Sequence, residues 1–248
     1  MILCERTRLR AGLAAALAGI VALAMLLPAC QMRPDGRPDA KPCLERLAAI
    51  GRALRAYHDE FGCFPPRYAA DESGRPLHSW RTLVLTYLGH EEILAEYDFG
   101  EPWDGPTNRP LADVPLEAFR CPQDRRPATG SGPTTTSYLA VGGPGTAWGG
   151  SEPRRLADLT DGPAETILVV EVADSGILWS EPRDLHVIQM AASVNSPTGQ
   201  GISSRHSGGA HVLLADGSTV FLPSGVTTED VRAMLTIAGG EDVDPRKY

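Results

Sequence analysis

An uncharged apolar stretch near the N-terminus sets the limits within which this chain can fold. It covers residues 11–29, is dominated by Ala and Leu, and follows a short segment that carries Arg6, Arg8 and Arg10. A basic segment before an apolar one is typical of a secretory signal rather than of a folded core. We therefore expect residues 1–29 to be a signal peptide and the fold to be built from the rest of the chain, outside the cytoplasm.

The stretch ends in Leu27-Pro28-Ala29-Cys30, which resembles the bacterial lipobox in its aliphatic residue, its small residue and its cysteine. We interpret Cys30 as the lipidation site and residues 30–42 as the lipid anchor and a flexible, proline-rich tether. Two alternatives stay open, an uncleaved membrane helix and an ordinary cleaved signal, because nineteen uncharged residues nearly span a bilayer core. The lipoprotein interpretation and both alternatives place residues 31–248 outside the cytoplasm, at the periplasmic face or the cell surface.

The composition limits the classes of partner. The chain has 248 residues, 42% of them hydrophobic, and a formal net charge of −8. An acidic chain without a basic block does not neutralise phosphates, so we expect no nucleic-acid partner, and the membrane is reached through the anchor. We find no internal repeat and no second domain boundary. The sequence therefore predicts one domain over residues 43–240, followed by a C-terminal tail over residues 241–248.

Three helices are predicted from apolar spacing and capping residues. Residues 43–61 place apolar side chains at helical intervals, and Gly62 ends the run. A second helix begins at Ser79 as N-cap and continues to about residue 94, with Gly89 as a candidate break. The last helix covers about residues 228–238. Residues 98–135, rich in Pro, Gly and Asp, are predicted to be loops.

Strands are predicted in the C-terminal half. Residues 137–141 and 166–172 are β-branched runs between turn residues, and residues 177–179 and 186–190 are weaker candidates. The clearest element is a hairpin of residues 210–215 and 218–222 around Asp216-Gly217, for which a type I′ turn is expected. Together the helices and strands predict an α+β fold with long Pro/Gly-rich loops and a C-terminal hairpin followed by a short helix.

Three cysteines remain in the predicted domain, in a compartment that permits disulfides. Cys43 and Cys63 bracket the first predicted helix. A helix of that length separates them by about 30 Å, and a disulfide requires Cα atoms within about 7 Å. Cys43 and Cys63 therefore should not pair, and Cys121 bonds to one of them or to neither.

A series of ordered motifs is similar to a known family. The chain resembles a pilin-like family of unknown function (domain of unknown function 1559), expanded in planctomycete-type bacteria and named for a C-terminal His-x9-Asp-Gly motif. Here His206 precedes Asp216-Gly217 at that spacing. The other matching blocks run in order from about residue 43 to 240: Tyr57-His58-Asp59, Phe64-Pro65-Pro66, Leu77-His78-Ser79-Trp80-Arg81, Glu101-Pro102-Trp103-Asp104, Phe119-Arg120-Cys121-Pro122, Asp158-Leu159-Thr160-Asp161-Gly162 and Trp179-Ser180-Glu181-Pro182.

The resemblance implies a pilin-like architecture, in which an N-terminal amphipathic helix packs on an antiparallel sheet. It also implies a disulfide between Cys43 and Cys121, because the family places cysteines at the matching positions. Many family members carry a prepilin leader whose cleavage exposes a filament-forming helix with an early glutamate. In this chain the apolar stretch precedes Cys30 and has no such residue. We therefore expect a membrane-tethered protein rather than a pilus subunit.

Several residues are candidate sites. His206, Asp216 and Gly217 are expected to shape the hairpin, with His206 bonding backbone in the loop before it. The alternative is a ligand or metal contact by His206, His211 and Asp216, which strand periodicity disfavours because His211 and Asp216 lie on opposite faces of a regular strand. Trp103 with Asp104, and Trp179 with Glu181, are candidates for ligand binding if they are exposed. The sequence shows no motif for a nucleophile, a metal or a cofactor, so none is expected. An acidic cluster has the oxygen ligands that calcium prefers but not the spacing of an EF-hand, and is expected to be a solvated turn: Asp158, Asp161, Glu165 and Glu171.

These observations predict a non-enzymatic, lipid-anchored protein of the cell envelope that works by binding or assembly with other envelope proteins. The alternative is an extracytoplasmic ligand-binding module for a glycan or for calcium. An enzyme of unrecognised type is the third reading.

Overall fold

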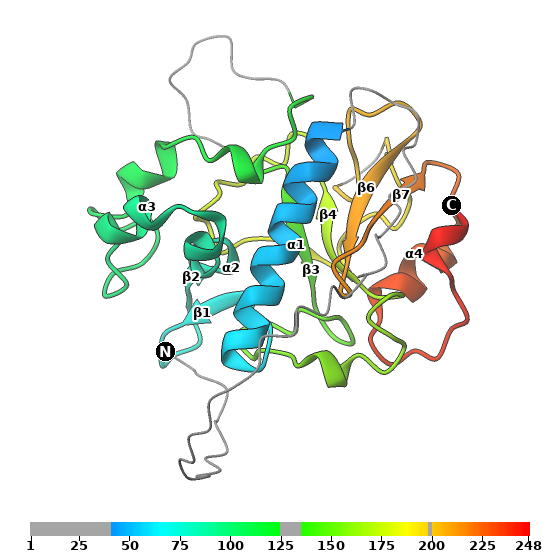
Figure 1. Cartoon of the computed structure of the whole chain (residues 1–248), viewed down its shortest axis with the longest axis horizontal. Coiled ribbons are helices and arrows are strands. Elements are labelled where there is room, and N and C mark those ends of the chain that lie inside the picture. The colour runs from blue at the N-terminus through cyan, green and yellow to red at the C-terminus, as the bar shows by residue number, and fades with distance from the viewer. Residues whose placement is uncertain (1–40, 125–134, 198–199) are drawn as a thin grey trace, which may run out of the picture.

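The computed structural model describes residues 41–124, 135–197 and 200–248 (Figure 1). The predicted signal peptide, Cys30 and residues 31–40 of the tether lie outside the described residues. Within the described ranges, none of the helices combines the length and the apolar character that crossing a bilayer requires. The α+β class predicted from the sequence is confirmed, with a long N-terminal helix lying on a sheet.

The first helix, α1 (Lys41–Phe61), confirms the helix predicted over residues 43–61. Its inner face carries Leu47, Ile50 and Leu54, each at most 1% exposed. The helix ends as expected at Gly62, whose φ of +76° is in the left-handed region and whose N donates to the carbonyl of His58 at 2.7 Å.

A five-stranded sheet has the order β5-β3-β4-β6-β7. All neighbours are antiparallel except β5, which pairs with β3 in parallel and makes the sheet mixed rather than purely antiparallel. The weaker strand prediction over residues 186–190 is reduced to the two-residue β5, and residues 177–179 form no strand. The strands are β3 (Tyr138–Gly142), β4 (Ile167–Glu171), β5 (Leu185–His186), β6 (Gly209–Leu214) and β7 (Thr219–Pro223).

The helix α1 lies on one face of this sheet (Figure 1), with its main strand contacts to β6 and β7. The backbone of α1 comes close to a side chain of the sheet at Gly51, where an added Cβ would lie 2.8 Å from Cδ1 of Leu213 on β6. Glycine at this helix position therefore lets α1 settle onto the sheet, at a cost in intrinsic helix propensity of about 1 kcal/mol.

The two faces of the sheet belong to separate hydrophobic cores. On β3, Tyr138 and Ala140 pack in the core that contains α1, and Leu139 and Val141 pack in the other core. This alternation follows from the two-residue period of a strand. The second core is covered by α4 (Thr228–Leu235), which supplies Val231, Met234 and Leu235. The helix α4 ends three residues before the predicted end at residue 238.

The hairpin β6–β7 is confirmed, but the predicted type I′ turn is wrong. That turn requires positive φ at both central residues. Gly217 has φ +88°, whereas among the described residues only Asp174 and Asn195 are non-glycines with positive φ. The N of Leu214 donates to the carbonyl of Ser218 at 2.9 Å, and the N of Gly217 to that of Leu214 at 3.0 Å. These bonds define a three-residue loop with Gly217 as its left-handed residue.

The region between α1 and β3 differs most from prediction. A short hairpin that was not predicted, β1 (Tyr68–Ala70) and β2 (Pro76–Ser79), precedes the second helical region. Ser79 caps it as expected, because its Oγ accepts from the N of Arg81 at 3.2 Å. The predicted helix is broken into three short pieces, with Gly89 at φ +76° between the last two: α2 (Trp80–Leu83), η1 (Leu85–Leu88) and α3 (Glu91–Glu96).

Residues 98–135 were predicted as loops, and the part described contains only two short 3-10 turns, η2 (Arg109–Asp113) and η3 (Glu117–Phe119). Two further 3-10 turns are η4 (Leu156–Asp158) and η5 (Pro245–Lys247). Long irregular connections thus surround a small amount of regular structure, as the Pro and Gly content indicates.

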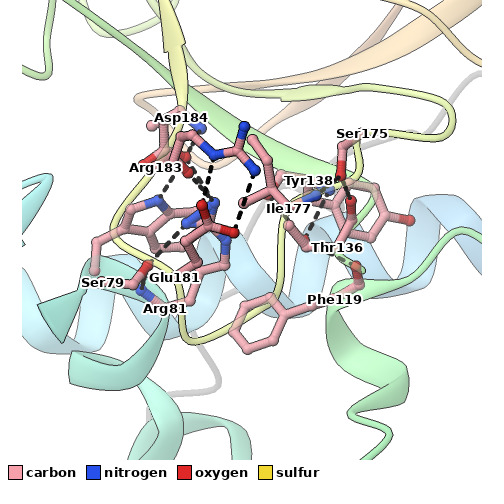
Figure 2. A network of polar contacts seen from close by, with 12 residues as sticks. Ser79, Arg81, Phe119, Thr136, Tyr138, Ser175, Ile177, Glu181, Arg183 and Asp184 are labelled. Carbon is pink, nitrogen blue, oxygen red and sulfur yellow. Dashed lines mark hydrogen bonds and ion pairs between the residues drawn. The ribbon is translucent and has the colours of Figure 1, made fainter. Parts of the chain in front are cut away.

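A buried ion pair ties the second helical region to the sheet. Arg81 of α2 donates to Oδ1 of Asp184 at 2.8 Å, and both side chains are fully buried. The same oxygen accepts from the N of Ala140 on β3 at 2.9 Å, and Arg81 also donates to Oγ of Ser79 at 2.8 Å (Figure 2). The chain before β5 is therefore anchored to both β3 and α2.

Candidate functional site

Four side chains with metal-ligating atoms meet beneath the first turn of α1. Their donor atoms all lie within 4.8 Å of one another, and each residue is at most 3% exposed. They come from α1, from the segment after η3, from the end of β4 and from the loop before β6, so the fold assembles the site from widely separated parts of the chain. These residues, the buried cluster, are Cys43, Cys121, Glu171 and His206.

Strand periodicity places two polar side chains of the sheet under α1. On β4, Glu171 shares a face with Val169, and on β6, His211 shares a face with Leu213. Val169 and Leu213 both belong to the core that contains α1. Glu171 and His211 therefore project to the same side, at the end of the sheet that Cys43 of α1 covers.

The segment that carries Cys121 is held by polar contacts. Its N donates to Oγ of Ser137 at 2.8 Å. Two residues earlier, the carbonyl of Phe119 accepts from Oγ1 of Thr136 at 3.0 Å, and Thr136 in turn accepts from Ser175 (Figure 2). The loop is thus fixed to the strand edge at the cysteine and two residues before it.

The two oxygens of Glu171 have different surroundings. Oε2 accepts two hydrogen bonds from His211, one from its backbone N at 2.7 Å and one from Nδ1 at 3.1 Å. Oε1 lies 3.4 Å from Nε2 of His206 and has no hydrogen-bond partner among the described residues. Burial alone would raise the pKa of Glu171, but contacts with His206 and His211 outweigh it and hold that pKa well below its usual range.

His206 is the bridge between the carboxylate and the cysteines. Its Nε2 lies 3.5 Å from Sγ of Cys121 as well as 3.4 Å from Glu171. Burial lowers the pKa of His206, but the contacts with Cys121 and Glu171 outweigh it and raise that pKa above its usual value. The rings of His206 and His211 meet edge to face with centroids 4.8 Å apart. In this arrangement Glu171 and His206 form a buried ion pair.

The cysteines are brought together, as the family resemblance implies, but no bond joins their sulfurs. The contact with Cys43 and then burial raise the pKa of Cys121 above its ordinary value. Cys63 lies just beyond the other end of α1, so its predicted separation from Cys43 agrees with the structure. The disulfide between Cys43 and Cys121 stays a prediction.

The two ends of the His-x9-Asp-Gly motif are separated by β6. His206 lies in the loop before the hairpin, as expected, but its ring faces Cys121 and Glu171 instead of loop backbone. At the far end, Asp216 accepts from the N of Ser218 at 2.8 Å and pairs with Arg246 at 2.7 Å. Only His206 of the motif therefore belongs to the buried cluster, and Asp216 with Gly217 shapes the turn.

The other candidate residues do not form a site together. Trp179 is 1% exposed, so its ring cannot stack on a ligand at the surface. Glu181 pairs with Arg183 at 2.6 Å, while Trp103 is half-buried and Asp104 is exposed. Burial of Trp179 thus removes one of the two tryptophan–carboxylate pairs considered for ligand binding.

The acidic cluster of the sequence is divided between separate places. Asp158 accepts from the N of Arg155 at 2.8 Å, and Asp161 accepts from the N of Gly239 and the N of Gly240, each at 2.8 Å. Glu171 lies in the buried cluster instead. Asp158 therefore closes a local turn, and Asp161 holds the segment that follows α4.

Sequence reasoning did not find the buried cluster as a unit. Glu171 was assigned to a solvated turn, and His206 and His211 were considered as ligands only together with Asp216. No spacing rule connects residues 43, 121, 171 and 206, because metal motifs are recognised by ligands close together in the chain. One signal in the sequence could have indicated part of the cluster. The alternation of side chains along β4 and β6 places the carboxylate of Glu171 and the imidazole of His211 on the buried face of two neighbouring strands.

The buried cluster has the donor atoms of a metal-binding site. Two sulfurs, an imidazole nitrogen and a carboxylate oxygen together suit a divalent cation of borderline softness. The same donors are shielded from solvent, since each residue is at most 3% exposed.

The fold and the cluster define a single α+β domain, with one long helix packed on a sheet around a polar centre rich in cysteine and histidine. The chain belongs to the family described as a protein of unknown function (DUF1559), whose model matches residues 40–196. The match includes Cys43, Cys121 and Glu171 and ends before His206. No curated protein and no solved structure matches the chain.

Proposed function

We propose that this chain is a lipid-anchored protein of the cell envelope, in which Cys30 carries the lipid and the α+β domain is displayed outside the cytoplasm for a binding or assembly role. The observation that carries the proposal is the order of three segments in the sequence. An uncharged apolar run ends at Ala29-Cys30, a proline-rich polar segment follows, and the first folded element begins at Lys41. That order leaves a short spacer between a lipidated cysteine and a folded domain.

A tethered domain fits the packing of α1 better than a filament subunit does. Filament assembly of the pilin type needs an apolar helix face that is available to other subunits. In α1 the apolar residues Leu47, Ile50 and Leu54 are already covered by the chain's own sheet. Within the described ranges, large hydrophobic side chains are exposed only at Phe99, Ile188 and Tyr248.

The proposal assigns no catalytic reaction to the chain. The side chains with the most reactive chemistry are those of the buried cluster, and each of its residues is at most 3% exposed. A general base or a nucleophile must come within hydrogen-bond reach of a substrate atom. Atoms enclosed under α1 do not meet that condition, which supports binding or assembly over catalysis.

The alternative of a glycan- or calcium-binding module has less support. Trp179 is buried at 1% exposure, and the oxygens of Asp161 are engaged by the amides of Gly239 and Gly240. Of the two tryptophan–carboxylate pairs that motivated this alternative, only Trp103 with Asp104 remains, and Trp103 is half-buried.

The test is the intact mass of the full chain, expressed in a bacterium that processes lipoproteins and extracted from its membranes with detergent. We expect the mass of residues 30–248 plus fatty acyl groups. The variant Cys30→Ala should retain residues 1–29 and lose the acyl mass, whereas the control Cys4→Ala should be processed like the original. Recovery of the original chain with Met1 at its start and an unmodified Cys30 would overturn the proposal.

A further inference from the structure

The geometry points to a structural metal site: we infer that the buried cluster, Cys43, Cys121, Glu171 and His206, binds one divalent cation of the zinc class. The cation would join the first turn of α1 to β4, to the loop before β6 and to the segment after η3. This inference concerns the domain itself and does not depend on the lipid anchor.

The distances between donor atoms match the edges of a zinc tetrahedron. Zinc binds sulfur at about 2.3 Å and nitrogen or oxygen at about 2.0 Å, so a tetrahedral site holds S and N about 3.5 Å apart and N and O about 3.3 Å apart. In the structure Sγ of Cys121 lies 3.5 Å from Nε2 of His206, and that nitrogen lies 3.4 Å from Oε1 of Glu171. Sγ of Cys43 lies within 4.8 Å of the other three donor atoms. Two of the donor pairs therefore have the spacing of a tetrahedral site, and the other pairs lie within 4.8 Å, close enough for one cation to join all four atoms.

Glu171 has one oxygen available for a metal bond. Oε2 is held by the two hydrogen bonds from His211, while Oε1 has no hydrogen-bond partner among the described residues. A ligating carboxylate is commonly oriented by a hydrogen bond to its other oxygen. His211 is thus a positioning residue for Glu171, and the side chain that it orients is 99% shielded from solvent.

The donor types select the cation. Calcium and magnesium prefer sites made of oxygen atoms, whereas two thiolates with an imidazole favour zinc among the common divalent metals. Four protein donors complete a tetrahedron and leave no position for a substrate, which is the character of a structural rather than a catalytic site. Binding releases to solvent the protons of the two thiols and the proton on Nε2 of His206, because thiolates and a neutral imidazole nitrogen are the ligands.

The same two sulfurs could instead form the disulfide that the family resemblance implies. A disulfide would account for the proximity of Cys43 and Cys121. It would not account for the placement of a buried carboxylate oxygen and a buried imidazole nitrogen within 4.8 Å of both sulfurs. This placement favours the cation, and the two states exclude each other chemically.

The experiment uses the full chain, purified from detergent lysates of whole cells without chelator or reductant, so that it does not depend on where the chain is located. Zinc is measured by elemental mass spectrometry, and the thiols of Cys43 and Cys121 are measured by non-reducing peptide mapping after denaturation in the presence of an alkylating agent. We expect about one zinc per chain and alkylation of both cysteines. A peptide cross-linked through Cys43 and Cys121, with zinc below a tenth of an atom per chain, would overturn the inference.

Variants locate the metal. Cys121→Ser and His206→Gln should each reduce bound zinc at least tenfold, and Cys63→Ser, at a buried cysteine outside the cluster, should retain it. His211→Gln should bind zinc 10- to 100-fold more weakly without abolishing the site, since it removes only the orientation of Glu171. Equal zinc content in Cys121→Ser and Cys63→Ser would contradict the assignment.

A spectroscopic readout covers the case in which a cluster variant fails to fold. The original chain is stripped of metal with a chelator and reloaded with Co²⁺, which reports its ligands by absorption. We expect thiolate-to-cobalt charge-transfer bands together with the intense visible bands of tetrahedral coordination. A reloaded chain that shows only the weak absorption of octahedral cobalt, without charge transfer from sulfur, would rule out the site.

Discussion

Glu171 on β4 accepts two hydrogen bonds at a single oxygen from His211 on the neighbouring strand β6, one from the backbone N at 2.7 Å and one from Nδ1 at 3.1 Å. The two residues are far apart in sequence and are paired because both strands turn the same face toward α1. A carboxylate that is almost fully buried is thereby held by main chain and side chain together. This pair sets the geometry of the whole cluster.

The first prediction concerns this pair. Glu171→Gln replaces one carboxylate oxygen with an NH2 group. If the NH2 group faces His211, the backbone N and Nδ1 of His211 lose their acceptor; if it faces His206, it meets Nε2 of that ring in place of an oxygen. We expect the free energy of unfolding to fall by about 1–3 kcal/mol. Urea unfolding followed by circular dichroism measures the change, and the exposed Glu152→Gln serves as the control. A loss of stability no larger than that of the control would contradict the described contact.

The second prediction concerns the buried pair of Arg81 and Asp184. Arg81→Met leaves a buried carboxylate without its counter-charge, and the expected loss is about 3–5 kcal/mol. The exposed helix pair Arg55–Asp59 offers a comparison, since solvent screens both charges and Arg55→Ala should lower the free energy of unfolding far less than Arg81→Met does. Both are measured by urea unfolding. In the double variant with Asp184→Asn, the loss should be smaller than the sum of the two single losses, and strict additivity would show that the pair is not coupled.

The third prediction is a pH dependence that arises from His78. This ring is 4% exposed and lies 2.9 Å from the hydroxyl of Tyr97, and burial lowers the pKa of His78 from its usual value. The unfolded chain therefore takes up a proton near pH 6.5 while the folded chain does not. The contribution of His78 to stability is complete above that pH and is lost as the pH falls from about 6.5 toward the folded pKa.

The measurement for His78 is the unfolding free energy between pH 5 and 8. A single group contributes a slope of at most about 1.4 kcal/mol per pH unit. His78→Gln should be less stable at pH 8 and should show a shallower decline below pH 6.5. If the variant and the original lose stability in parallel throughout this range, another group is responsible.

The fourth prediction tests the close approach of α1 to the sheet. Gly51→Ala gains helix propensity of about 1 kcal/mol, but its Cβ would lie 2.8 Å from Leu213, a side chain packed in the core. Overpacking in a core costs about 1–3 kcal/mol, so we expect a net loss or at best no gain. Thermal unfolding should show recovery when Leu213→Val is added. The exposed Gly225→Ala, with nothing within 4 Å of the new atom, should be neutral or slightly stabilising.

Elements with a strong local signal were predictable from the sequence. The apolar spacing of α1 and the stop at Gly62 gave its limits within two residues, and Ser79 was found as an N-cap from its chemistry alone. The hairpin at Asp216-Gly217 was located correctly, although the choice between a two-residue and a three-residue loop depends on the strand register, which the dipeptide does not determine.

Elements that depend on tertiary pairing were not predictable. The two-residue β5 has no periodicity of its own and exists because Val141 and Gly142 of β3 pair with it. The hairpin β1–β2 is equally short. The buried cluster and the pair of Arg81 with Asp184 join residues that are distant in the chain, so only the assembled fold brings their atoms together.

The contact between Gly51 and Leu213 has a consequence for how the polypeptide matures. A ribosome delivers the segment that will become α1 early and the segment that will become β6 late. Until the β6 segment has been synthesised, the apolar face of the α1 segment is not covered by the sheet and is exposed to nonspecific association. Proteins whose native contacts join residues far apart in sequence fold slowly. We therefore expect a chaperone to bind this chain until its C-terminal quarter has been synthesised.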